Sequence, residues 1–248
     1  MSRVSLGARL NLPTIEASLR AVQDGFERIN QTLTTPRDPL SDQVLDQLLA
    51  GYRQVDAWLE HGQDPFALGQ SAQLLGLNAL VLWGEAEPAC SEARHQLEAT
   101  EEQFYATGDG GIGELINCYQ LLEKQSIWRR SARVYIQILS QPQLFLEGNH
   151  RTGSLVMSYL LARAGKPPFV LSVDNAKAYF DPSTLVKNSR KHSLSMLLER
   201  PKLVKRFARL LQESADAKHM APSSPLHRPS LYRLGGRAPA RSGLRKPA

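Results

Sequence analysis

The sequence predicts an all-α fold, with a small hairpin at most. Apolar residues recur at spacings of three and four through most segments, and this spacing is typical of amphipathic helices. Few stretches alternate polar and apolar residues as half-buried strands do. No repeat of 20 to 50 residues is visible, which argues against a solenoid.

Composition is that of an ordinary globular protein, with 42% hydrophobic and 22% charged residues. The net charge of +6 comes from one end, because residues 218–248 contain seven basic residues and no acidic one. Residues 1–217 are nearly neutral, with 23 basic and 24 acidic residues. A nucleic-acid partner is therefore not expected, except through the basic tail.

The compartment follows from what the sequence lacks. Met1–Leu12 has no apolar segment of a secretory signal, and the longest apolar run, Leu74–Trp83, is too short to span a bilayer. Cys90 and Cys118 lie far apart and are interpreted as two buried reduced thiols. We expect a cytoplasmic protein without a membrane partner.

The N-terminal quarter predicts two helices joined by a proline-containing loop. Pro13 is suited to the start of the first helix and Ser41 to the cap of the second. A narrow apolar stripe runs along the first helix: Ile15, Leu19, Val22, Phe26, Ile29 and Leu33. The stripe predicts packing against the next helix of a bundle, and a homodimer through this stripe is the alternative.

The middle of the chain predicts four further helices around one flexible stretch. The expected helices are Phe66–Trp83, Pro88–Tyr105, Glu114–Lys124 and Ser126–Gln141. Ala106–Gly113 contains four glycines and is expected to be a loop or a flap. After residue 164 we expect a stop at Gly165–Pro168, short helices on either side of Pro182, and a last helix opened by Pro201.

The central feature is the stretch Gln143–Ser154 (QLFLEGNHRTGS), followed by the apolar run Leu155–Ala164. An almost entirely apolar helix is a buried helix, and Gly148-Asn149 before it suits a tight turn. The turn would deliver backbone N–H groups to a helix N-terminus, which attracts anions. A carboxylate beside such a phosphate site, here Glu147, is a natural Mg²⁺ ligand.

This stretch resembles the signature of the Fic (Fido) family, H-x-F-x-[DE]-G-N-x-R, whose usual chemistry is AMP transfer from ATP to a protein hydroxyl. Phe145, Glu147, Gly148, Asn149 and Arg151 match it position by position. The resemblance implies a Fic-type helical bundle at residues 65–216 with a short flap hairpin, preceded by an N-terminal helical extension (1–64). The Pro/Ser/Gly/Arg-rich composition after Ala217 predicts a basic disordered tail (217–248).

The same resemblance implies roles for individual residues. Phe145 anchors the loop, and Glu147 binds Mg²⁺. The phosphates of ATP or another nucleotide meet the remaining positions: Gly148, Asn149, His150, Arg151, Thr152 and Gly153. A flap upstream of the motif clamps the target protein, and the residues in that place are Gly110, Gly111, Ile112 and Gly113.

Two departures from the family pattern bear on activity. The family's general base is a histidine, but Gln143 stands in its place, and a carboxamide has no pKa suited to accept a proton near neutrality. His150 is a candidate substitute base, although its place in the turn favours a role as phosphate donor. Ser154 replaces the arginine that grips the outer phosphate, as in the phosphorylating Doc branch.

The function that we expect is weak or altered protein AMP (nucleotidyl) transfer by a Fic-like protein with an intact phosphate loop. An inactive nucleotide-binding or partner-binding pseudoenzyme and a Doc-like phosphotransferase are the alternatives. The target protein is not identified by the sequence.

Overall fold

The computed structural model describes residues 8–85 and 91–222. This part of the chain forms helices and no strand, so the all-α prediction is confirmed. The helices are α1 (Leu12–Asp24), α2 (Phe26–Thr32), α3 (Asp42–His61), α4 (Ala72–Trp83), α5 (Ser91–Phe104), α6 (Ile112–Leu121), α7 (Ile127–Leu139), α8 (Asn149–Arg163), α9 (Ala176–Lys187), α10 (Leu194–Glu213) and the short 3₁₀ helix η1 (Ala217–His219).

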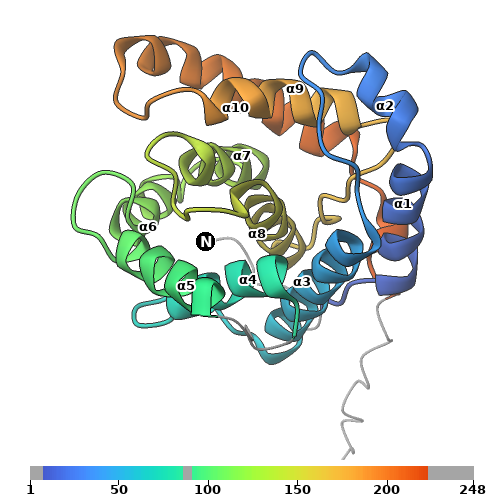
Figure 1. Ribbon diagram of the computed structural model, residues 1–248, viewed down its shortest axis with the longest axis horizontal. Coiled ribbons are helices and arrows are strands. Elements are labelled where there is room, and N and C mark those ends of the chain that lie inside the picture. The colour runs from blue at the N-terminus through green and yellow to red at the C-terminus, as the bar shows by residue number, and fades with distance from the viewer. Residues whose placement is uncertain (1–7, 86–90, 223–248) are drawn as a thin grey trace, which may run out of the picture.

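Helix α8 lies in the middle of the molecule, with α3 and α4 on one side and α7, α9 and α10 on the other (Figure 1). Every residue from Thr152 to Ala162 is buried, as the apolar run predicts. Two glycines permit close approach. A side chain at Gly153 would meet Tyr135 of α7, and one at Gly51 of α3 would meet Leu155. The start of α8 is therefore held on two sides by packed helices.

The hydrophobic core has two main parts, which α8 separates. Leu155 and Tyr159 face the part built with α1, α3, α4 and α6, whereas Met157 and Leu161 face the part built with α7, α9 and α10. The former part also includes Ile15 of α1. The described part of the N-terminal extension, residues 8–64, thus contributes to the same core as the motif helix.

Several helix boundaries differ from those that the sequence predicts. The apolar stripe of residues 15–33 is divided between α1 and α2 at Gly25, and α4 begins at Ala72 instead of Phe66. Pro182 lies inside α9, and Pro201 lies inside α10, which begins at Leu194. Proline at these places removes one N–H donor, but packing of the buried helix faces outweighs this local cost.

The hairpin that we expected upstream of the motif is not formed. The glycine-rich segment is a loop up to Gly111, and Ile112 and Gly113 already belong to the first turn of α6. Gly110 has a positive φ of 100° and donates its N–H to Glu114 Oε2 at 2.9 Å. The Glu114 side chain thereby holds this backbone in a turn that leads into a helix, where a strand pair would need it extended.

The folded body continues beyond residue 216, where the sequence suggests a disordered tail. His219 is 3% exposed, and Met220 forms an antiparallel bridge with Leu10. The Asn11 N–H donates to His219 O at 2.9 Å, so the end of the body is fixed to its beginning. Residues 217–221, which the sequence assigns to the tail, therefore belong to the folded body. Residues 223–248, and Cys90 in the central gap, lie outside the described part.

No helix in the described ranges has the length and apolar character needed to cross a membrane. Cys118 is a free, half-buried thiol whose pKa is raised by burial. A raised pKa keeps the thiol protonated and poorly nucleophilic.

Candidate functional site

The motif forms a loop that joins α7 to α8, and Phe145 anchors it. The Phe145 ring is 1% exposed and stacks on Phe104 of α5, with ring centroids 5.6 Å apart. Its neighbours Leu146 and Glu147 are exposed. The loop thus buries the aromatic side chain, as expected for Phe145, and presents the next two residues to solvent.

The side chain of Asn149 closes the loop through hydrogen bonds to the backbone of Phe145. Asn149 Nδ2 donates to Phe145 O at 2.7 Å, and Asn149 Oδ1 accepts from Phe145 N at 3.0 Å. Gly148 between them has φ 75° and ψ 2°, a left-handed conformation that glycine adopts most readily. A Cβ atom at Gly148 would also lie 2.8 Å from Asn78 Nδ2. The backbone conformation at position 148 thus favours glycine, and the two hydrogen bonds to Phe145 explain the asparagine at position 149.

This turn directs free backbone donors toward the loop mouth. The Thr152 N–H donates to Gly148 O at 2.9 Å and closes the first helical turn. The N–H groups of Asn149, His150 and Arg151 precede it, so they have no acceptor within the helix. Together with the positive end of the helix dipole, these donors favour an anion.

Glu147 is the carboxylate closest in sequence to these donors. Its backbone oxygen accepts from Asn78 Nδ2 at 2.9 Å, which leaves the side chain exposed beside the turn. In the described ranges no three His, Cys, Asp or Glu residues gather as metal ligands. The residues present fit Mg²⁺ only in the form in which phosphate and water supply most of its ligands, with Glu147 as the single protein ligand.

Gln143 stands where the Fic signature has its histidine, and both the nitrogen and the oxygen of its carboxamide are hydrogen-bonded. Its Nε2 donates to Leu139 O at 3.0 Å, and its Oε1 accepts from Asn149 Nδ2 at 3.3 Å. Gln103 Nε2 also donates to the Gln143 backbone oxygen at 2.6 Å. The side chain at this position thus connects the end of α7 to the start of α8, which is a structural role.

His150 points away from the loop mouth, into a chain of hydroxyl groups between α7 and α9. Its Nδ1 lies 3.1 Å from Tyr135 Oη, which lies 2.7 Å from Ser183 Oγ. The pKa of His150 is lowered to about 3, mainly by burial and also by the positive charges of Arg37 and Lys187. A group with this pKa is a poor base near neutrality, so the substitute-base interpretation is not supported by its surroundings.

Arg151 is directed toward α3 and α4. Its Nη1 donates to Gln47 Oε1 at 2.9 Å and to the Val81 backbone oxygen. Burial lowers the pKa of its guanidinium, and the charge of Glu147 partly offsets this. The charge therefore lies near the loop, but one of its nitrogens already has protein acceptors instead of a phosphate.

The remaining motif residues are structural. Thr152 is fully buried, and its Oγ1 accepts from Asn78 Nδ2 at 3.0 Å. Gly153 is buried against Tyr135, and Ser154 donates from Oγ to Arg151 O at 2.8 Å. Of the six positions that we expected to meet phosphate, Thr152 and Gly153 thus lie inside the packed helix, and Gly148 to Arg151 remain at the turn.

Residues that the motif does not contain complete the site. Asn78 of α4 supports the turn through Glu147 O and Thr152 Oγ1, while Tyr135, Tyr179 and Arg37 surround His150. Asn78 is a polar residue within an apolar run, and this was the one available sequence signal. The others come from distant segments and carry no local pattern.

Comparison with known proteins adds no relative. No model of a protein family, no curated protein and no solved structure matches this chain at a significant level.

Proposed function

We propose that this chain is a Fic-like protein that binds a phosphate-bearing ligand at the start of α8 and has weak or no AMP-transfer activity. The observation that carries the proposal is the turn itself. Gly148 is left-handed, Asn149 is bonded to both backbone groups of Phe145, and three N–H groups follow without helical acceptors. Such a turn is suited to phosphate whether or not catalysis follows.

The state of Gln143 supports weak or absent transfer. A general base must reach the proton that it removes, and it contributes about 10²–10⁴-fold to the rate. Gln143 has no basic group, and its carboxamide is already bonded to Leu139 and Asn149. Phosphoryl and nucleotidyl transfer depend mainly on positioning and charge stabilisation, so the loss of a base lowers the rate without removing the binding site.

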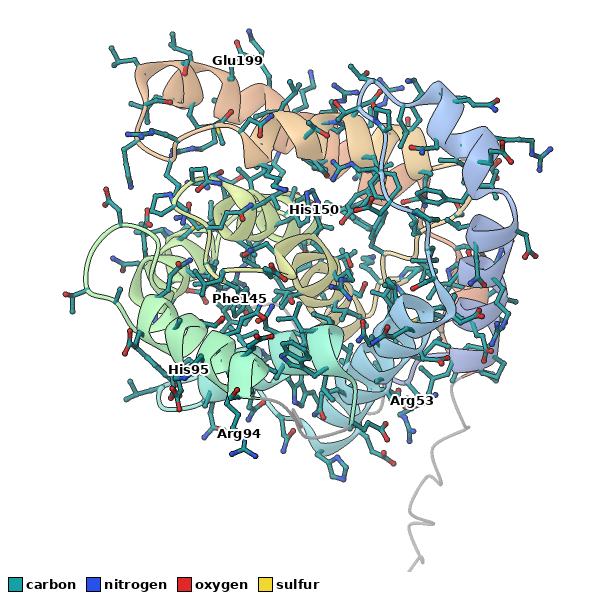
Figure 2. All side chains as sticks on the ribbon, in the orientation of Figure 1. Arg53, Arg94, His95, Phe145, His150 and Glu199 are labelled. Atoms are coloured by element: carbon teal, nitrogen blue, oxygen red, sulfur yellow. The ribbon has the colours of Figure 1, made fainter. Side chains whose placement is uncertain are left out.

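The binding experiment is a calorimetric titration with ATP, with and without Mg²⁺. We expect saturable binding that depends on Mg²⁺, and we expect Glu147→Gln to remove that dependence. Glu199→Gln is the matched control, because Glu199 is also an exposed carboxylate but lies on the outer side of α10 (Figure 2). No binding of ATP at millimolar concentration with Mg²⁺ would contradict the proposal.

The catalytic experiment is restoration of the base by Gln143→His. Incorporation of label from α-labelled ATP into the protein and into a cell extract should increase roughly tenfold or more. This is less than the full contribution of a general base, about 10²–10⁴-fold. The gain is limited because Ser154 cannot replace an arginine on the outer phosphate. The control is Gln141→His, whose exposed side chain lies two residues before the base position.

The choice of label distinguishes the alternatives. Strong transfer from α-labelled ATP by the native protein would show that Gln143 is not at a base position. Transfer from γ-labelled ATP alone would identify a Doc-like phosphotransferase, which the serine at position 154 also favours. Binding without transfer in both proteins would identify a ligand-binding pseudoenzyme.

A further inference from the structure

A cavity of about 300 Å³ lies beside the first turn of α8, between α1, α3, α8, α9 and the loop before α3. Its walls are mainly apolar and include Leu19, Leu48, Phe169 and Phe180. His150, Arg151 and Ser154 line it from α8, whereas no residue from Gln143 to Asn149 does. The cavity is therefore distinct from the mouth of the phosphate loop.

Arg37 gives this cavity a cationic character, and Arg151 lies on the wall formed by α8. Arg37 and Arg151 both line it, and in the described part of the chain neither forms an ion pair. Arg37 Nη2 donates to Thr184 Oγ1 at 2.6 Å, but its Nε is buried without a partner. Asp38 also lines the cavity, although its side chain is exposed. A half-buried positive charge without a carboxylate partner favours an anionic ligand.

The backbone of Arg37 is fixed in advance of any ligand. The Arg37 N–H donates to Asn30 Oδ1 at 2.8 Å, and Asn30 Nδ2 donates to Arg37 O at 3.0 Å. The guanidinium also lies over the Phe180 ring, 5.5 Å from its centroid. Such a cation needs little reorganisation on binding, which favours affinity.

His150 contributes a hydrogen-bond acceptor, and a proton count along the hydroxyl chain shows why. Ser183 Oγ lies 2.6 Å from Tyr179 O, and because a carbonyl cannot donate, the serine proton is used there. Tyr135 must then donate to Ser183, and His150 Nδ1–H must donate to Tyr135. The neutral imidazole therefore carries a lone pair on Nε2, and this atom is buried without a partner.

We propose that this cavity binds a small organic anion with an apolar body, whose carboxylate or phosphate faces Arg37 and whose N–H or O–H donates to His150 Nε2. This ligand is additional to the nucleotide of the proposed function. A nucleoside triphosphate does not suit the cavity, because ribose hydroxyls would lie against apolar walls without partners. The volume also lies at the lower end of the range for small-molecule sites, about 300–1,000 Å³.

The test is calorimetric titration of the full chain with four probes. 4-Hydroxyphenylacetate has a ring, a donor and an anion, 4-methoxyphenylacetate lacks the donor, and 4-hydroxyphenylethanol lacks the anion. Phenyl phosphate tests phosphate as the anionic group. We expect 4-hydroxyphenylacetate or phenyl phosphate to bind, and loss of either polar group from the former to weaken binding about tenfold or more.

Protein variants assign the binding to the cavity. Arg37→Met should weaken binding of the anionic probes about tenfold or more, whereas Arg94→Met, at an exposed site on α5, should not (Figure 2). The ¹⁵N resonance of His150 Nε2 should shift with 4-hydroxyphenylacetate and not with the methoxy analogue. This signal is read in the native protein, so it does not depend on the folding of any variant.

Failure of this proposal and failure of the phosphate-loop proposal are distinguishable. Withdrawal of Mg²⁺ and Glu147→Gln should not change probe binding, and Arg37→Met should not change ATP binding at the loop. Absence of saturable binding by all four probes at millimolar concentration would overturn the cavity proposal. Binding that is unaffected by Arg37→Met and leaves the His150 resonance unchanged would overturn it equally.

Discussion

The motif loop (residues 143–148) and the cavity meet at the first turn of α8, but they are built in opposite ways. The loop consists of neighbouring residues whose backbone supplies the donors, with Gly148 and Asn149 setting the turn. The cavity is assembled from segments far apart in sequence, and side chains such as Arg37 and His150 supply its polar groups. Figure 2 shows Phe145 and His150 on different sides of the start of α8.

The comparison shows that two different kinds of site can be built at one helix terminus. Backbone donors at the loop mouth are present for any sequence that keeps the turn, and Glu147 is the acidic group beside them. The cavity instead depends on half-buried side-chain charge, which requires the packing of α1, α3 and α9 around α8. Variants at the loop should therefore act through backbone geometry, and variants at the cavity through hydrogen bonds and protonation.

The largest expected effect is at the loop anchor. Phe145→Ala should lower the free energy of unfolding by about 3–5 kcal/mol, because it removes a buried ring that stacks on Phe104. Leu146→Ala, at an adjacent side chain that is 43% exposed, should change it by less than about 1 kcal/mol. Urea unfolding of both variants measures the difference. Equal losses would show that the loop is not anchored through this ring.

The next effect concerns the backbone of the turn. Gly148→Ala should lower the free energy of unfolding by about 3 kcal/mol, because alanine is strained in the left-handed conformation and its Cβ would collide with Asn78. Gly62→Ala shares the positive φ but has no atom within 4 Å of the new Cβ, so it should cost only about 1–2 kcal/mol. The gap between the two variants in urea unfolding isolates the contact with Asn78, and a gap of zero would argue against it.

The burial of His150 beside the cavity should make the stability of the protein depend on pH. In the unfolded chain His150 binds a proton below about pH 6.5, whereas in the folded protein its pKa is lowered to about 3, mainly by burial. Between these values only the unfolded state holds the extra proton, so stability decreases as the pH decreases. As the pH falls from 7 to 5, His150 should lower the free energy of unfolding by about 2 kcal/mol.

The measurement is urea unfolding of the native protein and of His150→Gln at several pH values. The slope with pH should be smaller in the variant by the contribution of one histidine. His219, which is also buried with a lowered pKa, adds to the slope in both proteins and cancels in the comparison. His95→Gln, at an exposed histidine of α5, should keep the native slope (Figure 2). Parallel curves for the native protein and His150→Gln would contradict the prediction.

The smallest effect tests the hydroxyl chain. Tyr135→Phe removes the partner of His150 Nδ1 and of Ser183 Oγ, and it should cost about 1–2 kcal/mol. Tyr105→Phe, at an exposed tyrosine, is the control. In the native protein, ¹⁵N spectra should show His150 protonated at Nδ1. A proton on Nε2 would reverse the hydrogen-bond directions that we assign to the chain.

The loop was largely predictable because its causes are local. The positive φ of Gly148, the closure by Asn149 and the burial of Phe145 all follow from residues within a few positions of one another. The central position of α8 was predictable as well, because Leu155–Ala162 contains almost no residue suited to solvent. The prediction of a hairpin was wrong, because the Glu114 side chain accepts a hydrogen bond from the Gly110 N–H and a helix begins directly afterwards.

The sequence by itself determined the helical class, the buried motif helix and the turn that begins it, since spacing, capping and conformational preference act over a few residues. Only the tertiary structure decided what each motif side chain does. It bonds Gln143 to Leu139 and Asn149, turns Arg151 toward Gln47, and buries His150 beside Tyr135. These outcomes depend on which distant helices pack against α8, and the burial and charges that they bring set the pKa of His150.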